Sequence, residues 1–355
     1  MNDNNYMQIA LNLAKKGKGK VYPNPLVGCV IVKDNKVVGK GWHQHFGGNH
    51  AEINALRDAG GNAEGADLYV TLEPCNSYGK KPPCTLAIVK AGIKRVYYAI
   101  PDSNVSGSRE VLQKNNIEVY EGLLKKQAEV LIKDYLKYLK SKPKVSVKAA
   151  MTLDGKIATY EYDSKWITSE ESRNFVHKMR SRYDAVLVGT NTALKDNPFL
   201  TTHSKNLKNP IRVVIDSKLK LPESHHLFDV CIPTIVIYDS NVKSIPEHLK
   251  KEGIILSPID IDAARKDFNV VVKKLNYLSL KRILIEGGSE IIASALFSNA
   301  VNDIYFFIAP KIAGGKTAIS VVGGAGVKKI SESLPVKNMK VKKVGFDLLV
   351  TGRIK

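Results

Sequence analysis

Short apolar runs alternate with amphipathic stretches along the whole chain, and this alternation restricts the fold more than any other feature of the sequence. In the first half, runs with the character of strands occupy residues 26–33, 36–42, 66–75, 94–102 and 117–122. Stretches with helical spacing of apolar residues occupy 6–16, 50–60, 82–92, 109–116 and 123–141. Because this pattern is typical of a sheet covered by helices, we predict an α/β layered fold.

The alternation begins again after Ser141-Lys142-Pro143. Strand-like runs then occupy 144–153, 184–191, 211–217, 234–239, 282–288 and 303–310, and helical patterns occupy 171–180 and 288–298. A chain of 355 residues is too long for one ordinary core. We therefore predict two α/β domains, residues 1–144 and 145–355.

Composition excludes several classes of protein. The four cysteines are too few and too dispersed for a disulfide framework, and the apolar surroundings of Cys29 and Cys231 predict small core residues. No apolar run is long enough to span a membrane and the first residues lack a signal-peptide pattern, so we expect a cytoplasmic protein. The net charge of +20 is spread along the chain, which suits phosphate-bearing substrates better than a nucleic-acid groove.

Three pieces of the first half converge on one chemistry. His50 opens a predicted helix, Cys75 ends a predicted strand, and Cys84 begins another helix. One imidazole and two thiolates form a tetrahedral zinc site with a fourth position open for water, whose pKa the metal lowers. Glu52 lies two residues beyond His50 and can move protons without binding the metal. His-x-Glu with Pro-Cys and a second Cys is the signature of zinc-dependent nucleobase deaminases.

Two alternatives stay open from the residues alone. Eight residues lie between the two cysteines instead of the usual two, and the inserted loop carries Lys80 and Lys81, which suit an anionic substrate. The chain could instead be a nucleic-acid (tRNA) editing deaminase, or a reductase with a structural zinc to which His43 or His45 supplies a fourth ligand.

The second half of the sequence has fewer motifs that indicate a function. It has no G-x-G-x-x-G after a strand, so a Rossmann dinucleotide site is not indicated. It does have a Gly287-Gly288 pair between a strand and a helix, where free backbone N–H groups suit a phosphate. Residues 190–198 are polar and follow a strand, which indicates either a ligand crevice or a connecting turn.

Together these motifs resemble the bifunctional riboflavin-biosynthesis deaminase–reductases. The resemblance covers almost the whole chain, through PNPLVGCVIV, GWH, HAE, TLEPC…GKKPPC, VKAAMTLDGKIA, SKWIT, VGTNTALKDNP and LIEGG in that order. It implies a cytidine-deaminase-like three-layer domain followed by a dihydrofolate-reductase-like domain. It also implies Zn²⁺ and NADPH as cofactors and a homo-oligomer that binds neither nucleic acid nor membrane.

For the first domain, the resemblance implies that His50, Cys75 and Cys84 hold zinc and that Glu52 is the proton donor. It places Asn24, His43 and Lys80 near the pyrimidine substrate. Family members commonly have a histidine where this chain has Ser77.

For the second domain, the resemblance implies cofactor and substrate positions. The cofactor positions are Ala150, Trp166, Thr192, Asp196, Ser217, Gly288, Ser289, Glu290, Ile291, Ile292, Ala293 and Ser294. The substrate positions are Ser164, Arg180, Leu200, His203 and Glu286, with the Arg180 guanidinium suited to the ribose phosphate. The family usually has an arginine at position 203, so phosphate binding here is expected to be weaker, sensitive to pH, or taken over by Lys205.

The implied reactions are successive. The first removes the 2-amino group of 2,5-diamino-6-(5-phosphoribosylamino)pyrimidin-4-one. The second uses NADPH to reduce the ribosyl group of 5-amino-6-(5-phosphoribosylamino)uracil to ribityl.

Overall fold

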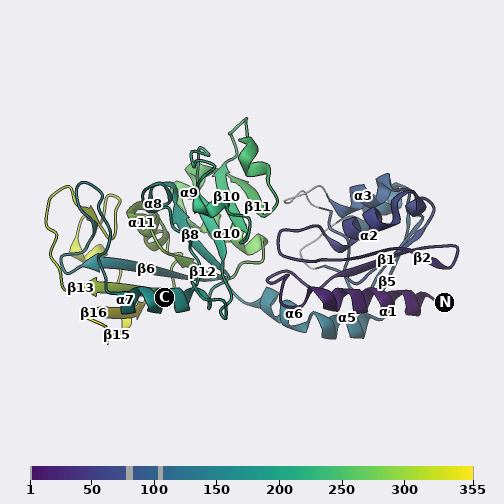
Figure 1. Ribbon diagram of the computed structural model, residues 1–355, viewed down its shortest axis with the longest axis horizontal. Coiled ribbons are helices and arrows are strands. Elements are labelled where there is room, and N and C mark those ends of the chain that lie inside the picture. The colour runs from purple at the N-terminus through teal and green to yellow at the C-terminus, as the bar shows by residue number, and fades with distance from the viewer. Residues whose placement is uncertain (1, 77–82, 103–106, 355) are drawn as a thin grey trace. The chain divides into compact units, whose positions relative to one another are not determined.

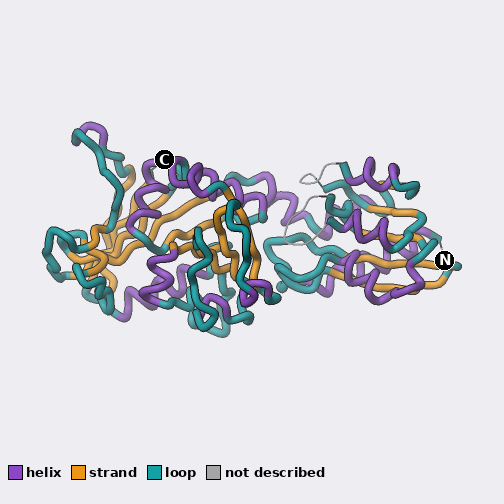
Figure 2. Tube along the Cα trace, turned by 90° about the horizontal axis from the view of Figure 1, so that it is seen from above, coloured by secondary structure: helices purple, strands orange, loops and turns teal. Residues whose placement is uncertain are grey.

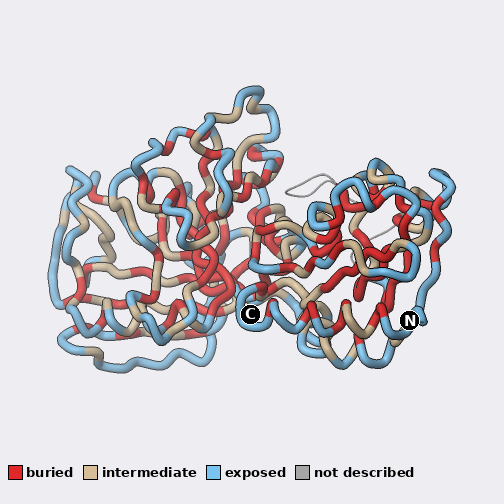
Figure 3. The backbone as a smooth tube through the Cα atoms, turned by 45° about the vertical axis from the view of Figure 1, so that its right-hand side comes forward, coloured by how far each residue is buried: buried red, intermediate tan, exposed pale blue. Residues whose placement is uncertain are grey.

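The chain forms two compact units, Met1–Ser141 (unit 1) and Lys142–Lys355 (unit 2), in a computed structural model that describes residues 2–76, 83–102 and 107–354. Each unit encloses its own buried apolar clusters, shown in red in Figure 3. Within the described ranges, no helix is both long and apolar enough to cross a membrane.

Unit 1 is built on one five-stranded sheet in the order β2-β1-β3-β4-β5. Its strands are β1 (Gly28–Lys33), β2 (Lys36–Trp42), β3 (Asp67–Val70), β4 (Arg95–Tyr98) and β5 (Glu118–Glu121). Its helices are α1 (Asp3–Ala14), α2 (Ala51–Ala59), α3 (Cys84–Lys90), α4 (Ser108–Lys114), α5 (Lys125–Leu131) and α6 (Lys133–Lys140). Strand β1 is antiparallel to β2 and β3, whereas β3, β4 and β5 are parallel.

Helices cover both faces of this sheet. One core cluster joins the sheet to α2, α3 and α4, and another joins the opposite face to α1 and α5 (Figure 1). Alternate residues of β1 divide between the two clusters, because successive side chains of a strand point to opposite faces. The predicted three-layer α/β fold is confirmed for this unit.

Glycines let two helices approach the sheet at backbone distance. A Cβ atom at Gly28 would lie 2.0 Å from the Ala10 carbonyl oxygen of α1, and one at Gly41 would lie 2.2 Å from the Ala51 oxygen of α2. Since the obstructing atoms belong to the backbone, no rotamer change relieves either contact. The first turn of α2 is therefore fixed directly on β2.

Three tyrosines stack across the parallel strands. Tyr69, Tyr97 and Tyr120 are register partners on β3, β4 and β5. Their rings stack with centroids 4.6 Å and 4.9 Å apart. We call these three rings the tyrosine ladder.

Unit 2 is built on a nine-stranded sheet, and two short strands, β7 and β14, form a separate pair. Its strands are β6 (Lys144–Thr152), β7 (Lys156–Ala158), β8 (Ala185–Gly189), β9 (Ile211–Ile215), β10 (Thr234–Asp239), β11 (Ile254–Ile259), β12 (Arg282–Ile285), β13 (Asp303–Ala309), β14 (Ile319–Ser320), β15 (Lys337–Val344) and β16 (Asp347–Arg353). Its helices are α7 (Glu170–Arg180), α8 (Thr190–Asp196), α9 (Ile261–Lys266), α10 (Asn269–Tyr277) and α11 (Ser289–Phe297).

The order in the large sheet is β11-β10-β9-β8-β12-β6-β13-β16-β15, with the strands drawn in orange in Figure 2. The first seven strands in this order, from β11 at the edge to β13, are parallel to one another. Strand β16 is antiparallel to β13, and β15 is antiparallel to β16. The carboxyl ends of β8, β9, β12 and β6 therefore share one edge of the sheet, where ligands of such sheets bind.

Three local expectations were wrong. Residues 123–141 form two helices, because the backbone of Ile132 leaves helical geometry (φ −110°) where its side chain packs into the core. The polar segment after β8 is helix α8 and not the connecting turn that was one of two expectations, despite the weak helix propensity of its threonines and asparagine; the ligand crevice stays a prediction. Cys231 is exposed, unlike the fully buried Cys29, because it lies in a loop whose backbone carbonyls turn inward to Arg212.

Candidate active sites

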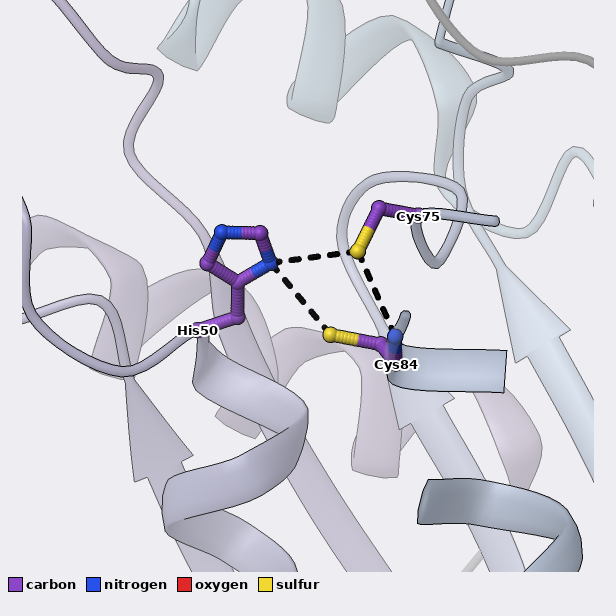
Figure 4. Close-up of side chains that lie close together, drawn as sticks. All are labelled: His50, Cys75 and Cys84. Atoms are coloured by element: carbon purple, nitrogen blue, oxygen red, sulfur yellow. Dashed lines mark hydrogen bonds between the residues drawn. The ribbon is translucent and has the colours of Figure 1, made fainter. Parts of the chain in front are cut away.

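One imidazole and two thiols meet in unit 1. Figure 4 shows the His50 Nδ1 atom facing both sulfur atoms, 3.5 Å from Cys75 Sγ and 3.3 Å from Cys84 Sγ. His50 is the N-cap of α2, Cys84 is the first residue of α3, and Cys75 follows β3. The backbone N–H of Cys84 donates to Cys75 Sγ, so the start of α3 orients the second sulfur.

The two thiols share their protons unequally. The hydrogen bond from the Cys84 thiol is the largest cause of the lowered pKa of Cys75. The same bond, followed by burial, raises the pKa of Cys84. The lowered pKa of Cys75 favours its thiolate, the form that binds metals.

This donor set fits zinc. Tetrahedral bonds from zinc to nitrogen and sulfur separate the two donor atoms by about 3.5 Å, close to the distances from His50 to the two sulfurs. Within the described ranges, no fourth histidine, cysteine or carboxylate joins the three. Both ring nitrogens of His43 are engaged elsewhere, with Asn24 and with the Asn49 carbonyl. The arrangement is that of a site with one open position.

Glu52 lies beside the cluster on the first turn of α2. Glu52 is only 3% exposed, and burial raises the pKa of its carboxyl group despite the opposing charge of His50. It also shares a hydrogen bond with the Cys84 thiol. A buried carboxyl group with a raised pKa suits a group that must both accept and donate a proton near neutral pH.

Two of the three expected pyrimidine-binding residues contact each other. The Asn24 amide nitrogen is 3.1 Å from His43 Nε2, and His43 Nδ1 is 3.0 Å from the Asn49 carbonyl oxygen. The His43 and His50 rings meet edge to face, with centroids 5.9 Å apart, so the pair lies next to the metal cluster. Lys80 and Ser77 fall outside the described residues.

In unit 2, several expected cofactor and substrate residues gather at the carboxyl edge of the sheet. Ser164 Oγ donates to Asp196 Oδ1 at 3.0 Å, which ties the loop after β7 to the end of α8. The side chain of Thr192 on α8 lies 3.1 Å from where a Cβ atom of Gly287 would be. Ser217 follows β9 at the same edge.

The start of α11 fits a phosphate-bearing cofactor. Its N-cap, Gly288, has φ +83° and no side chain to cap the helix, so the first N–H groups stay open to a ligand. Ser294 Oγ is buried without a hydrogen-bond partner in the part of the chain that the structure describes. Open N–H groups and an unpaired hydroxyl in one segment suit the nucleotide of NADPH. The expected positions Gly288, Ser289, Glu290, Ile291, Ile292, Ala293 and Ser294 all belong to this segment.

Sequence reasoning missed the segment that packs on α11, because its glycines indicate only a loop. Gly323 N donates to the Ser289 carbonyl, Gly324 N donates to Glu290 Oε1, and Ser289 Oγ donates to the Ser320 carbonyl. Residues 320–324 therefore line the start of the helix.

Arg180 and Glu286 form a buried ion pair. Arg180 Nε and Nη2 donate to the two carboxylate oxygens of Glu286 at 2.6 Å and 3.0 Å, and Nη1 donates to the Thr201 carbonyl. Burial alone would raise the pKa of Glu286, but the charges of Arg180 and Lys148 outweigh burial and lower it to about 2. Both residues were expected to contact substrate, and the structure joins them to each other.

Lys148 and His177 also belong to this cluster and were not found from the sequence. Lys148 Nζ is 3.7 Å from Glu286 Oε2, and burial lowers the pKa of this lysine. His177 lies one turn before Arg180 on α7 and stacks on His203. In the sequence, Lys148 alternates with Val147 and Ala149, a pattern that is typical of a lysine on the exposed face of a strand. Helical spacing alone does not distinguish His177 from a surface residue.

The remaining expected residues lie nearby on separate elements. Ala150 is on β6 and packs against the small cluster around Phe307. Leu200 is 3% exposed with φ +54°. Trp166 is 64% exposed, with the Arg173 guanidinium 4.5 Å from its ring centroid.

Comparison with known families gives a separate match for each of the two units. Residues 143–350 match the family described as the RibD C-terminal domain. Residues 1–100 match the cytidine and deoxycytidylate deaminase zinc-binding region.

Named relatives match nearly the whole chain. The riboflavin biosynthesis protein RibD of Aquifex aeolicus (strain VF5) is 43% identical over 98% of this chain and 97% of its own length. The protein of the same name from Escherichia coli (strain K12) is 34% identical over 98% of each.

Solved structures are similar as well. The diaminohydroxyphosphoribosylaminopyrimidine deaminase/5-amino-6-(5-phosphoribosylamino)uracil reductase of Thermotoga maritima has a TM-score of 0.54 and 37% identity, covering 99% of this chain and 98% of that one. A form of Acinetobacter baumannii RibD has the same TM-score, 31% identity and the same coverage.

Proposed function

This chain belongs to the RibD family of bifunctional riboflavin-biosynthesis deaminase–reductases, and on that basis we propose how its two units divide the two reactions. Unit 1 deaminates 2,5-diamino-6-(5-phosphoribosylamino)pyrimidin-4-one. Unit 2 reduces the ribosyl group of 5-amino-6-(5-phosphoribosylamino)uracil with NADPH. The observation that carries the assignment is the cluster of His50, Cys75 and Cys84 with buried Glu52 beside it.

In unit 1, His50, Cys75 and Cys84 hold the zinc, which when bound supplies a water molecule of lowered pKa. Glu52 accepts a proton from the attacking water and passes it to the pyrimidine ring nitrogen and then to the leaving ammonia. Burial supports this role, because a raised pKa lets one carboxyl group act first as base and then as acid.

Asn24 and His43 orient the pyrimidine. Because the Asn24 amide nitrogen donates to His43 Nε2, the Nδ1 atom of that ring carries the proton and donates to the Asn49 carbonyl. The ring is thereby held at both nitrogens, and Asn24 keeps its amide oxygen for the substrate. Lys80 contributes a positive charge for the substrate phosphate.

In unit 2, the protein's contribution is orientation. Bound NADPH supplies the hydride that reaches C1′ of the ribose. The start of α11 and Ser294 bind the nucleotide, and Thr192 lies against Gly287 at the same place. Ser164 holds Asp196 at the end of α8, and this pair helps to orient the nicotinamide against the sugar.

A coupled assay tests this division. Zinc-loaded protein is given the diaminopyrimidine substrate, and ammonia release and NADPH oxidation are followed together. Glu52→Gln should lower ammonia release about 10²–10⁴-fold and still reduce supplied 5-amino-6-(5-phosphoribosylamino)uracil at the wild-type rate. Ammonia release that survives the substitution would remove Glu52 from the mechanism, and its absence from the wild type would indicate a structural zinc.

We also propose that the chain is a cytoplasmic homo-oligomer that binds neither nucleic acid nor membrane. All four cysteines are free, as in a reducing compartment. Val341 and Leu348 on the paired strands β15 and β16 are 58% and 43% exposed and share one face of the sheet. Light scattering after chromatography should give the mass of an oligomer, and Val341→Lys should reduce it if this face is the interface.

A further inference from the structure

The two cysteines of the metal cluster lie at the ends of a long connection. Eight residues separate Cys75 from Cys84, whereas the signature of nucleobase deaminases has two. Because a longer loop costs more chain entropy to close, the connection itself holds the two sulfur atoms together less firmly. Their spacing must therefore depend on contacts at the two ends of the connection.

Such contacts come from the first turn of α3. The backbone N–H of Cys84 donates to Cys75 Sγ at 3.3 Å (Figure 4), and the N–H of Thr85 donates to the Cys75 carbonyl oxygen at 3.2 Å. The Thr85 hydroxyl donates to Asn76 Oδ1 at 3.0 Å. These hydrogen bonds from two consecutive residues fix Cys75 and Asn76 against the start of α3.

Thr85 is the residue of this turn whose side chain takes part. It is 0% exposed, and a buried hydroxyl needs a hydrogen-bond partner. Valine has the same shape and no hydroxyl, so packing alone gives no reason for a threonine. The reason lies in the bond to Asn76, the residue that follows a metal ligand.

The residues before Cys75 are fixed from another helix. The Ser108 hydroxyl, at the start of α4, donates to the Pro74 carbonyl oxygen at 2.9 Å, and the N–H of Glu73 donates to the Ile100 carbonyl oxygen. Loss of the Thr85 hydroxyl would leave these bonds in place. Its effect is therefore confined to the end of the segment next to the metal.

Resting on the zinc site of the proposed function, we propose that Thr85 is a positioning residue of that site. Its hydroxyl acts through Asn76 and holds the Cys75 thiolate in the orientation that faces His50 and Cys84. Removing a partner that orients a metal ligand costs about 10–100-fold in metal affinity. Because Thr85 acts through Asn76, we expect the lower end of this range.

Metal affinity tests the proposal without relying on catalysis. Full-length protein is stripped of metal, and its zinc dissociation constant is measured by competition with a chromophoric chelator. Thr85→Val keeps the shape, removes the hydroxyl and should raise the constant about tenfold. Thr85→Ser keeps the hydroxyl and should stay within about twofold of the wild type. An unchanged constant in Thr85→Val, or an equal rise in Thr85→Ser, would overturn the proposal.

Cobalt(II) reports the geometry of the site. Bound in place of zinc, it gives absorption bands that depend on the arrangement of its nitrogen and sulfur ligands. Thr85→Val should shift or weaken the thiolate-to-cobalt band, and Thr85→Ser should restore it. Identical spectra of the wild type and Thr85→Val would mean that Thr85 does not orient Cys75.

Two further variants separate positioning from loss of stability. Ile88, on the same helix, is 0% exposed and belongs to the core cluster. Ile88→Val should lower the unfolding free energy and leave the zinc constant unchanged. A rise equal to that of Thr85→Val would assign the effect to a loosened helix and overturn the proposal.

A double-mutant cycle assigns the effect to the bond. In an Asn76→Ala background, Thr85→Val should raise the zinc constant no further, because its partner is already gone. A full additional rise would show that Thr85 does not act through Asn76.

The outcome is separable from the proposed function. Protein whose zinc affinity follows these predictions but that never releases ammonia from the diaminopyrimidine would contradict the proposed deamination alone. Protein that deaminates, with the same zinc constant in the wild type and Thr85→Val, would contradict the positioning role alone.

Discussion

Arg212 shows how one side chain can hold a loop in unit 2. It is 1% exposed, and its guanidinium donates to the carbonyls of His226, Asp229 and Ile232. Asn197 accepts from the backbone N–H of His226 and Thr234 donates to the Leu227 carbonyl, and Arg212 by itself holds three carbonyls of loop 226–232. Burial lowers the pKa of this arginine to about 10, which leaves it charged at neutral pH.

We expect Arg212→Met to destabilise unit 2 by about 3–5 kcal/mol, because three buried carbonyl groups lose their donors. Urea unfolding measures the loss. The matched control is Arg265→Ala, which removes an exposed arginine paired with Asp262 and should change stability by less than about 0.5 kcal/mol. Equal effects of the two substitutions would contradict the anchoring role.

The lowered pKa values of His177 and Glu286 predict how the stability of unit 2 depends on pH. His177 has a lowered pKa in the folded state, so its contribution is lost as the pH falls from the unfolded value near 6.5 towards 4. The pKa of Glu286 is lowered to about 2, so its contribution is present above about 4.3 and lost below that value. Unfolding free energy measured from pH 7 to 3 should therefore fall in two steps.

Variants separate the two steps. His177→Asn should flatten the step above pH 4, and Glu286→Gln should flatten the step below about 4.3. The prediction fails if either variant keeps the step attributed to its residue.

The sequence predicted the residues of the metal cluster better than those of the reductase site. His50, Glu52, Cys75 and Cys84 lie at element ends, and local spacing reveals such positions. The partners Lys148 and Glu286 come from strands adjacent in the sheet but far apart in the chain, a pairing that only tertiary structure creates.

At the scale of elements, α11 packs against the end of β8 through a glycine. A Cβ atom at Gly189 would lie 2.6 Å from Cδ1 of Ile291, a side-chain atom that can be removed by substitution. Gly189→Ala should cost about 1–3 kcal/mol of stability through overpacking. Adding Ile291→Val, which deletes that atom, should recover part of the loss, as a double-mutant cycle of unfolding free energies would show.

A matched glycine serves as the control. Gly61 has no atom within 4 Å of its added Cβ and no positive φ, so Gly61→Ala should be close to neutral. If Gly189→Ala is equally neutral, the helix can move away from the strand.

Elements with strong periodicity were predicted well, and elements set by long-range pairing were not. Residues 6–16 and 50–60 predicted α1 and α2 because their apolar spacing is helical. Strand β15, by contrast, is exposed along almost its whole length, so no burial pattern marks it in the sequence. It is a strand because β16 offers it backbone partners.

At the scale of the whole molecule, the two units have separate cores and carry separate chemistry. Cys75→Ala should therefore remove bound zinc and ammonia release while leaving reduction of supplied 5-amino-6-(5-phosphoribosylamino)uracil unchanged. Zinc content by mass spectrometry and the two activities measure this. Treating the wild type with a chelator should give the same split, and a parallel loss of reduction would mean that unit 2 depends on the zinc of unit 1.

The number of units and the α/β class followed from the alternation of patterns, because each core needs its own set of strands and helices. The sequence could not supply the order of the nine strands, since β12 and β6 pair across more than a hundred residues of intervening chain. That pairing is what assembles the ion-pair cluster.

The tyrosine ladder gives unit 1 an optical signature. Stacked phenol rings in a fixed orientation couple their electronic transitions, and near-ultraviolet circular dichroism reports such fixed packing and vanishes when it loosens. Tyr69, Tyr97 and Tyr120 lie on three different strands, so the signal lasts only while all three stay in register. The difference between the near-ultraviolet circular dichroism spectra of the wild type and Tyr97→Leu separates the ladder from the other twelve tyrosines and the two tryptophans, and its loss on heating follows the melting of the unit 1 sheet.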